Sequence, residues 1–192
     1  FDIFEDDYQR IANIYGDYTY DLTDMAAAVD YDSFSYPCLN NQVIAWKGNL
    51  NSIVEQPQVG GVFYDKDAFE KAGVTAEPKT WVEFLDVCQK LKDSGVGPIA
   101  QDSAYCDFAF YHQLVRHLGE EKIEELSTNG GWTGSDAEVA AQEIIDLVDA
   151  GYFVDGAPDE FPSSENKIGF GLASMIVCAN YVTAEVNNNT GT

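Results

Sequence analysis

The stretch that decides the fold is GGVFYDKDAFEKAG at residues 60–73, followed by PKTWVEF at residues 78–84. The apolar run Val59–Tyr64 predicts a buried strand whose glycines allow close approach of another main chain. The next residues, Lys66–Ala72, predict a short helix that ends at Gly73. A strand that leads directly into a helix is the first indication of an α/β architecture.

The second part of this stretch predicts a longer amphipathic helix. Thr80 and Glu83 have the spacing of a capping box, in which each side chain accepts a hydrogen bond from a main-chain amide at the helix start. The apolar residues that follow recur at the spacing of one helical face: Trp81, Phe84, Leu85, Cys88 and Leu91. We therefore expect this face of the helix to be buried.

Strand and helix patterns alternate on both sides of this stretch. Downstream we expect buried strands at Pro98–Ala100 and Leu172–Cys178, and helices at Asp107–Leu118, Glu120–Leu126, Asn180–Val186 and, behind a second capping box at Ser135–Glu138, up to Gly151. A polar loop is predicted at Asp155–Glu165. Upstream we expect a strand at Phe1–Phe4, a helix at Asp6–Tyr15 and a hairpin at Val43–Val54. The alternation predicts an α/β fold.

The charge of the chain is strongly acidic. Among 192 residues there are 33 acidic and 10 basic side chains, which gives a formal net charge of −23. Such a chain repels phosphate backbones and anionic lipid headgroups, so binding to nucleic acid or to a membrane surface is disfavoured. No apolar run approaches the roughly 18 residues of a membrane-spanning helix.

The cysteines and histidines show no metal-binding pattern. The cysteines are Cys38, Cys88, Cys106 and Cys178, and no two of them form a C-x-x-C pair. None lies at zinc-ligand spacing from His112 or His117, so we expect neither a metal nor another cofactor. Free, buried cysteines are the favoured interpretation, and one disulfide is left open if the protein is exported.

The sequence contains no motif of a known catalytic site. A nucleophile elbow, a metalloprotease helix, a phosphate-binding loop and a dinucleotide fingerprint are all missing. The many acidic residues leave open a glycoside hydrolase, whose two carboxylates stand roughly 5–10 Å apart. Aromatic residues make up 13% of the chain, and aromatic platforms beside carboxylates and amides suit the apolar faces and hydroxyl rim of a sugar. An interaction module without a small ligand is a third hypothesis.

Several motifs resemble the family of extracellular solute-binding proteins of ABC importers, the sugar-binding family that includes maltose-binding protein. The strongest are residues 61–73 and 78–84, which resemble the family's Tyr-Asn-Lys-Asp strand end, its helix closing in Ala-Gly, and its Pro-x-Thr-Trp-x-Glu. This chain departs from the pattern at Asp65, where the family usually has Asn. Weaker matches follow in the family's order, among them Gly95–Ala100 and Gly171–Met175.

The resemblance implies a periplasmic-binding-protein-like fold of two α/β lobes that close on a ligand. Residues 1–58 would be part of the first lobe and the hinge, and residues 59–192 most of the second lobe, so the chain would be a piece of a longer protein. The implied function is solute binding without catalysis, with a mono- or oligosaccharide as ligand and ABC permease subunits as partners. The implied protein is a monomer, extracellular or periplasmic, and lipid-anchored as a precursor.

Seven residues match positions that bind ligand in the family. They are Asp7, Gln58, Tyr105, Asp107, Phe108, Asn180 and Tyr181. Gln58 falls at a hinge position where maltose-binding protein has a sugar-contacting carboxylate, so a charge has become an amide. Tyr181 follows the Met175 strand where the family often has a stacking Trp. Two other aromatic residues, Trp81 and Trp132, are expected in the core.

Overall fold

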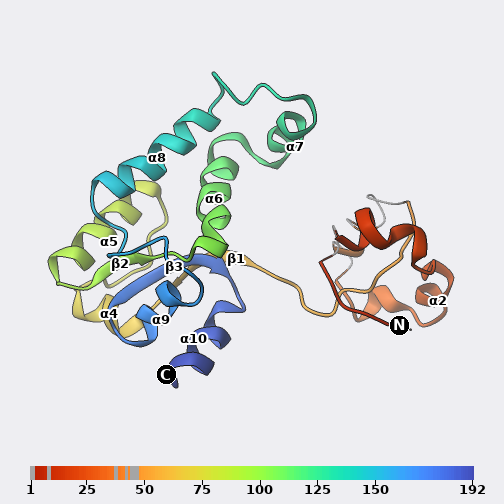
Figure 1. The fold of residues 1–192 in the computed structure, drawn as a ribbon, viewed down its shortest axis with the longest axis horizontal. Coiled ribbons are helices and arrows are strands. Elements are labelled where there is room, and N and C mark those ends of the chain that lie inside the picture. Colours follow the sequence, from red (N-terminus) through yellow and green to blue (C-terminus); the bar gives the residue numbers. More distant parts are fainter. Residues whose placement is uncertain (1–2, 8–9, 37–38, 42, 44–47) are drawn as a thin grey trace. The chain divides into compact units, whose positions relative to one another are not determined.

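The chain divides after Pro57 into two compact units, shown in the computed structural model of Figure 1. The structure describes residues 3–7, 10–36, 39–41, 43 and 48–192. The observed division falls one residue before the predicted one, and the assignment of the two units to two lobes stays a prediction. None of the helices in the described ranges has the length and hydrophobicity to cross a lipid bilayer.

The first unit is built from short helical turns. They are the π-helix η1 (Ile11–Tyr15), the 3-10 helix η2 (Gly16–Tyr18), α2 (Thr23–Ala28) and the 3-10 helix η3 (Tyr31–Ser33). The helix predicted at Asp6–Tyr15 is therefore shorter than expected, and Arg10 at its N-cap makes no capping hydrogen bond through its side chain. The predicted strand is wrong at Ile3 and Phe4, and its first two residues lie outside the described ranges.

The predicted hairpin at Val43–Val54 is wrong where the structure describes it. The carbonyl of Leu50 accepts a hydrogen bond from the amide of Leu22 at 2.6 Å, and its own amide donates to Oγ1 of Thr23 at 3.2 Å. Because the segment that begins α2 binds both main-chain groups of Leu50, they are not available to a neighbouring strand. Residues 44–47, which cover most of the first predicted hairpin strand and the start of its turn, lie outside the described residues.

The second unit contains a three-stranded sheet in the order β1-β3-β2. Its strands are β1 (Gly60–Tyr64), β2 (Gly97–Ala100) and β3 (Ala173–Ala179). β3 runs antiparallel to β1 and parallel to β2, and every residue of it is buried. The prediction that β1 is buried is wrong: Val62 is 43% exposed, because β1 has only β3 beside it among the described strands.

Helices cover both faces of this sheet (Figure 1). The helices of this unit are α4 (Lys66–Lys71), α5 (Trp81–Asp93), α6 (Cys106–Leu118), α7 (Glu120–Asn129), α8 (Ala137–Asp149), α9 (Ser163–Gly169) and α10 (Val182–Thr190). Of these, α7 packs on α6 and lies away from the sheet. Met175 of β3 packs with α5 and α8, whereas its neighbour Ile176 packs with α9 and α10. The alternation of side chains along β3 thus separates two hydrophobic layers.

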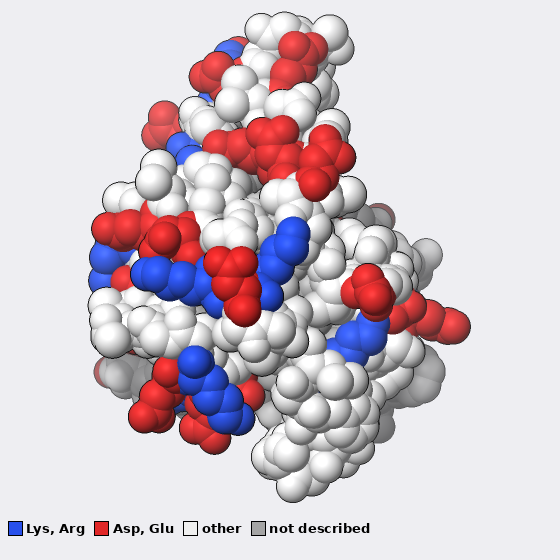
Figure 2. All heavy atoms as spheres, turned by 90° about the vertical axis from the view of Figure 1, so that its left-hand side faces the viewer, with Lys and Arg blue, Asp and Glu red and all other residues white. Residues whose placement is uncertain are grey.

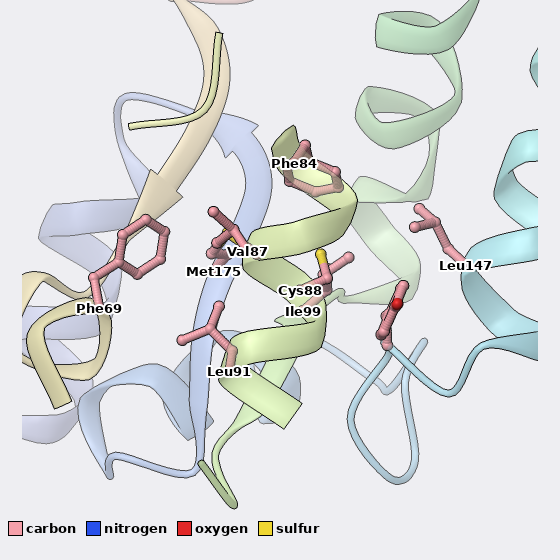
Figure 3. Close-up of a cluster of buried hydrophobic side chains, with 9 residues drawn as sticks. Phe69, Phe84, Val87, Cys88, Leu91, Ile99, Leu147 and Met175 are labelled. Carbon is pink, nitrogen blue, oxygen red and sulfur yellow. The ribbon is translucent and has the colours of Figure 1, made fainter. Parts of the chain in front are cut away.

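The predicted apolar stripe of α5 forms the largest core cluster. Leu91 and Cys88 are fully buried and lie among Val87, Ile99 and Met175 (Figure 3). Trp81 and Trp132 also pack against buried clusters, as predicted. Cys88 and Cys178 are free and buried as expected, but free Cys106 is exposed, and Cys38 lies outside the described residues.

Only the first of the two predicted capping boxes forms. Thr80 accepts from the amide of Glu83 at 3.2 Å, and the Glu83 carboxylate accepts from the Thr80 amide at 3.0 Å. At the start of α8 the hydroxyl of Ser135 donates instead to the carbonyl of Trp132 at 2.5 Å, and the N-cap is Asp136. The Ser135 hydroxyl accepts from the amide of Ala137 at 3.2 Å, and the Glu138 carboxylate accepts from the amide of Gly134 at 2.8 Å, so neither makes the hydrogen bond of the predicted box.

Candidate ligand-binding site

The sheet topology brings the ends of all three strands to one edge. β2 and β3 are parallel, so their carboxyl ends lie together, and antiparallel β1 begins beside the end of β3, with Gly60 opposite Ala179. Asn180 extends this pairing: its amide donates to the carbonyl of Val59 at 3.1 Å, and its Oδ1 accepts from the amide of Val59 at 3.0 Å. We call this place the sheet edge. It gathers six of the seven predicted residues: Gln58, Tyr105, Asp107, Phe108, Asn180 and Tyr181.

Aromatic rings form the centre of the sheet edge. The ring centroid of Tyr105 lies 5.6 Å from that of Tyr181 and 6.3 Å from that of Phe108. A fourth ring, Phe161, lies 5.6 Å from Tyr105 and is 42% exposed. Burial raises the pKa of the Tyr105 and Tyr181 hydroxyls, so both remain neutral donors at ordinary pH. Sequence reasoning missed Phe161, although an aromatic residue in a polar loop is a usable signal.

A hollow of about 250 Å³ on α6 adjoins these rings. Its lining consists of Asp107, Phe108, Phe110, Tyr111 and Leu114. Asp107 and Phe108 were predicted as ligand-binding residues, whereas Phe110, which is 38% exposed, was not. Tyr111, which is 47% exposed, was not singled out. The density of aromatic residues in the first turns of the predicted helix could have indicated both.

An acidic group lies beneath the rings. The Tyr105 hydroxyl donates to the Glu185 carboxylate at 3.2 Å, and the fully buried Asp102 accepts from the amides of Ser164 and Glu165 at 2.9 and 3.0 Å. Glu165 also has no exposed surface. The predicted polar loop at Asp155–Glu165 is wrong at its end, because Ser163 begins α9 and Glu165 points into the protein.

Two of the predicted residues, Gln58 at the sheet edge and Asp7 in the first unit, take no part in the ring contacts. Gln58 is exposed, two residues before β1. Asp7 is exposed in the first unit, where its carbonyl accepts from the amide of Ile11 at 2.9 Å. The structure thus joins Tyr105, Phe108 and Tyr181 by ring contacts, whereas a role for Asp7 in the same site stays a prediction.

A larger cavity of about 500 Å³ lies on the other face of the sheet and contains none of the predicted residues. Its lining is mostly apolar, with Met175 and Val177 from β3 and side chains of α5, α6 and α8. The polar side chains at this cavity pair with one another: Arg116 lies 4.6 Å over the Trp81 ring and donates to Gln113 at 2.8 Å. Arg116 and Gln113 are therefore already engaged within the protein.

Comparison with known proteins identifies similar chains. A family described as bacterial extracellular solute-binding protein matches residues 1–176. The sn-glycerol-3-phosphate-binding periplasmic protein UgpB of Rhizobium meliloti (strain 1021) is 41% identical over 103 residues, which are 48% of this chain and 23% of that protein.

Solved structures show the same fold at low identity. A chitin oligosaccharide binding protein is 22% identical with a TM-score of 0.75, and the match covers 88% of this chain and 42% of that one. A manno-oligosaccharide specific solute binding protein of Bifidobacterium animalis subsp. lactis, in complex with mannotriose, is 18% identical with a TM-score of 0.58; that match covers 80% of this chain and 39% of that one. The chain therefore spans less than half the length of these proteins.

Proposed function

Because the chain belongs to the family of bacterial extracellular solute-binding proteins, we propose that it binds a carbohydrate at the sheet edge for delivery to an ABC importer. The observation that carries the proposal is the contact of Tyr105 with Phe108 and Tyr181, next to the exposed polar groups of Asp107 and Asn180. Aromatic faces stack on the apolar side of a sugar, and amides and carboxylates pair with its hydroxyls. The fold, periplasmic-binding-protein-like, supports this use of the site.

A phosphate ester is the main competing ligand, because the UgpB relative is named for sn-glycerol-3-phosphate. A phosphate group is normally bound by Arg, Lys or helix N-termini. None of the seven predicted residues is basic, and the acidic side chains Asp107, Asp102 and Glu185 lie at or below the sheet edge. These charges favour a neutral ligand over an anion.

The proposal includes binding without catalysis, and the relatives are named as binding proteins. A glycoside hydrolase would need two carboxylates that both reach the glycosidic bond. Glu165 and Asp102 are fully buried and face main-chain or side-chain groups of the protein, so neither can act on a bound sugar. Of the other carboxylates discussed at this edge, Asp107 is exposed, and Glu185 is half-buried and accepts from the Tyr105 hydroxyl.

The family is extracellular, and UgpB relatives are periplasmic, which supports a location outside the cytoplasmic membrane. Lipid anchoring and a monomeric state belong to the proposal. The acidic side chains on the face drawn in Figure 2 have basic ones between them, with uncharged areas around both. That face thus presents no continuous basic surface to nucleic acid or anionic lipid.

A thermal-shift screen of the native full-length protein tests the proposed function. Chitin, manno- and xylo-oligosaccharides are compared with sn-glycerol-3-phosphate, and aryl glycosides are tested for turnover. A specific sugar at 100 times its Kd is expected to stabilise the protein by about 2.7 kcal/mol and to raise its Tm, whereas no aryl glycoside is cleaved. Stabilisation by sn-glycerol-3-phosphate alone would contradict the carbohydrate assignment, and turnover would contradict the assignment as a binding protein.

A further inference from the structure

A carboxyl group without any exposed surface lies directly under the rings of the sheet edge. Glu165 is 0% exposed, and among the described residues neither of its carboxyl oxygens has a hydrogen-bond donor. An ionised carboxylate in such surroundings has lost its hydration without gaining a partner, which is strongly unfavourable. The local geometry therefore favours the protonated form of this side chain.

The titratable groups that surround Glu165 supply no positive charge. They come from each element packed against α9 and are Asp102 after β2, Tyr105 in the 3-10 helix η4 (Ser103–Tyr105), Cys178 in β3, Tyr181 before α10 and Glu185 on α10. The basic side chain of α9, Lys167, donates to Oδ2 of Asp159 at 2.6 Å and to the carbonyl of Asp155 at 2.8 Å. The positive charge of Lys167 is therefore paired with Asp159 and not with Glu165.

The hydrogen bonds in this group show which carboxyl carries the proton. Asp102 accepts from two main-chain amides, and Glu185 accepts from the Tyr105 hydroxyl, so both of these carboxyl groups already have a hydrogen-bond donor. Glu165 lacks such donors, and its carboxyl group interacts with that of Glu185 where α9 packs against α10. A hydrogen bond between two carboxyl groups requires that one of them is protonated.

We propose that protonated Glu165 donates a hydrogen bond to the Glu185 carboxylate. This hydrogen bond stabilises the packing of α10 on α9 and, through Glu185, the position of the Tyr105 side chain at the sheet edge. α9 and α10 pack together, and Ile168, Val182 and Val186 form the hydrophobic contact between them. Loss of the proton leaves two negative charges facing each other in a poorly solvated place. Their repulsion loosens α10 and, through Glu185, the hydroxyl of Tyr105.

The pH range of this effect follows from the acidity of Glu165. Burial, followed by the charges of Glu185 and Asp102, raises the pKa of Glu165 from 4.5 to about 8. Between these values the folded chain holds a proton that the unfolded chain has released. The stabilisation is complete below about pH 4.5 and disappears as the pH rises to about 8, with a loss of up to tenfold per pH unit in the folding constant.

The variant Glu165→Gln tests the proposal, because its amide donates to Glu185 as the protonated acid does but cannot titrate. In urea unfolding from pH 5 to pH 9, the folding constant of the variant divided by that of the wild type should rise by up to about tenfold per pH unit until about pH 8. Glu160→Gln, which removes an exposed acid before α9, should follow the wild type at every pH. Parallel profiles for Glu165→Gln and wild type would overturn the proposal.

Two further measurements keep the test decisive if Glu165→Gln folds poorly. The wild type at pH 7 should show the infrared carbonyl band of a protonated carboxyl, which disappears above pH 9; absence of the band contradicts the shared proton. Hydrogen exchange of the α10 amides should be faster in the wild type than in Glu185→Gln at pH 9 and similar at pH 6. Equal exchange at pH 9 contradicts the proposal that the shared proton stabilises the packing of α10. No ligand is needed, so the outcome is independent of the proposed function.

Discussion

Leu91→Ala is expected to lower the free energy of unfolding by about 2–5 kcal/mol. Leu91 is fully buried in the cluster between α5 and β3, where it contacts the layer formed by Cys88, Val87 and Met175 (Figure 3). Removing its side chain leaves a cavity that the packed neighbours fill only in part. Urea unfolding at constant pH measures the loss.

The matched control for this change is Leu172→Ala. Leu172 is 61% exposed and precedes β3, so the same substitution should change the free energy of unfolding by no more than about 0.5 kcal/mol. A loss at Leu91 as small as the loss at Leu172 would contradict the placement of the α5 stripe in the core.

Asp102→Ala is the second change with a large expected effect. Its carboxylate is the acceptor for the amides of Ser164 and Glu165, and all three residues are buried. Each amide left without a partner costs about 1–3 kcal/mol, so the free energy of unfolding should fall by roughly 2–5 kcal/mol. Removal of a carboxylate whose burial is unfavourable, and raises its pKa, offsets a part of this loss.

Asp102→Asn separates the two contributions. The asparagine keeps one acceptor oxygen for the start of α9 and removes the negative charge, so its loss in urea unfolding should be clearly smaller than that of the alanine variant. Equal losses for the two variants would show that the hydrogen bonds to α9 are not what Asp102 contributes.

Much of the second unit could be predicted because its helix starts and buried helix faces are marked by patterns within short stretches of sequence. The capping box of Thr80 and Glu83 fixes the start of α5, and the spacing of its apolar residues fixes the buried face. The sheet edge follows from the same elements, since residues after parallel strands must meet. Tyr105, Phe108 and Tyr181 were predicted from the resemblance to the family, by their alignment with its ligand-binding positions, and no motif of their own marks them.

Other features depend on partners that a local pattern does not reveal. Leu50 has the apolar neighbours of a strand, but the groups that bind its main chain lie near Leu22, far away in sequence. Ser135 has the spacing of a cap, but its hydroxyl bonds to the preceding turn. Glu165 lies in a polar run that predicts a loop. The packing of α9 against α10 and β3 buries its side chain.

Calorimetric titration of the native full-length protein and three variants tests the central claim that the sheet edge binds a sugar. Asp107→Asn and Tyr111→Ala alter exposed side chains of the hollow on α6. The control, Phe170→Ala, removes an exposed ring at the end of α9, near the start of β3. With the sugar found by thermal shift, each hollow variant should weaken binding at least about tenfold, or about 1.4 kcal/mol, and Phe170→Ala should bind as the wild type does. Unchanged affinity in both hollow variants, or an equal loss in Phe170→Ala, would contradict the assignment of the site.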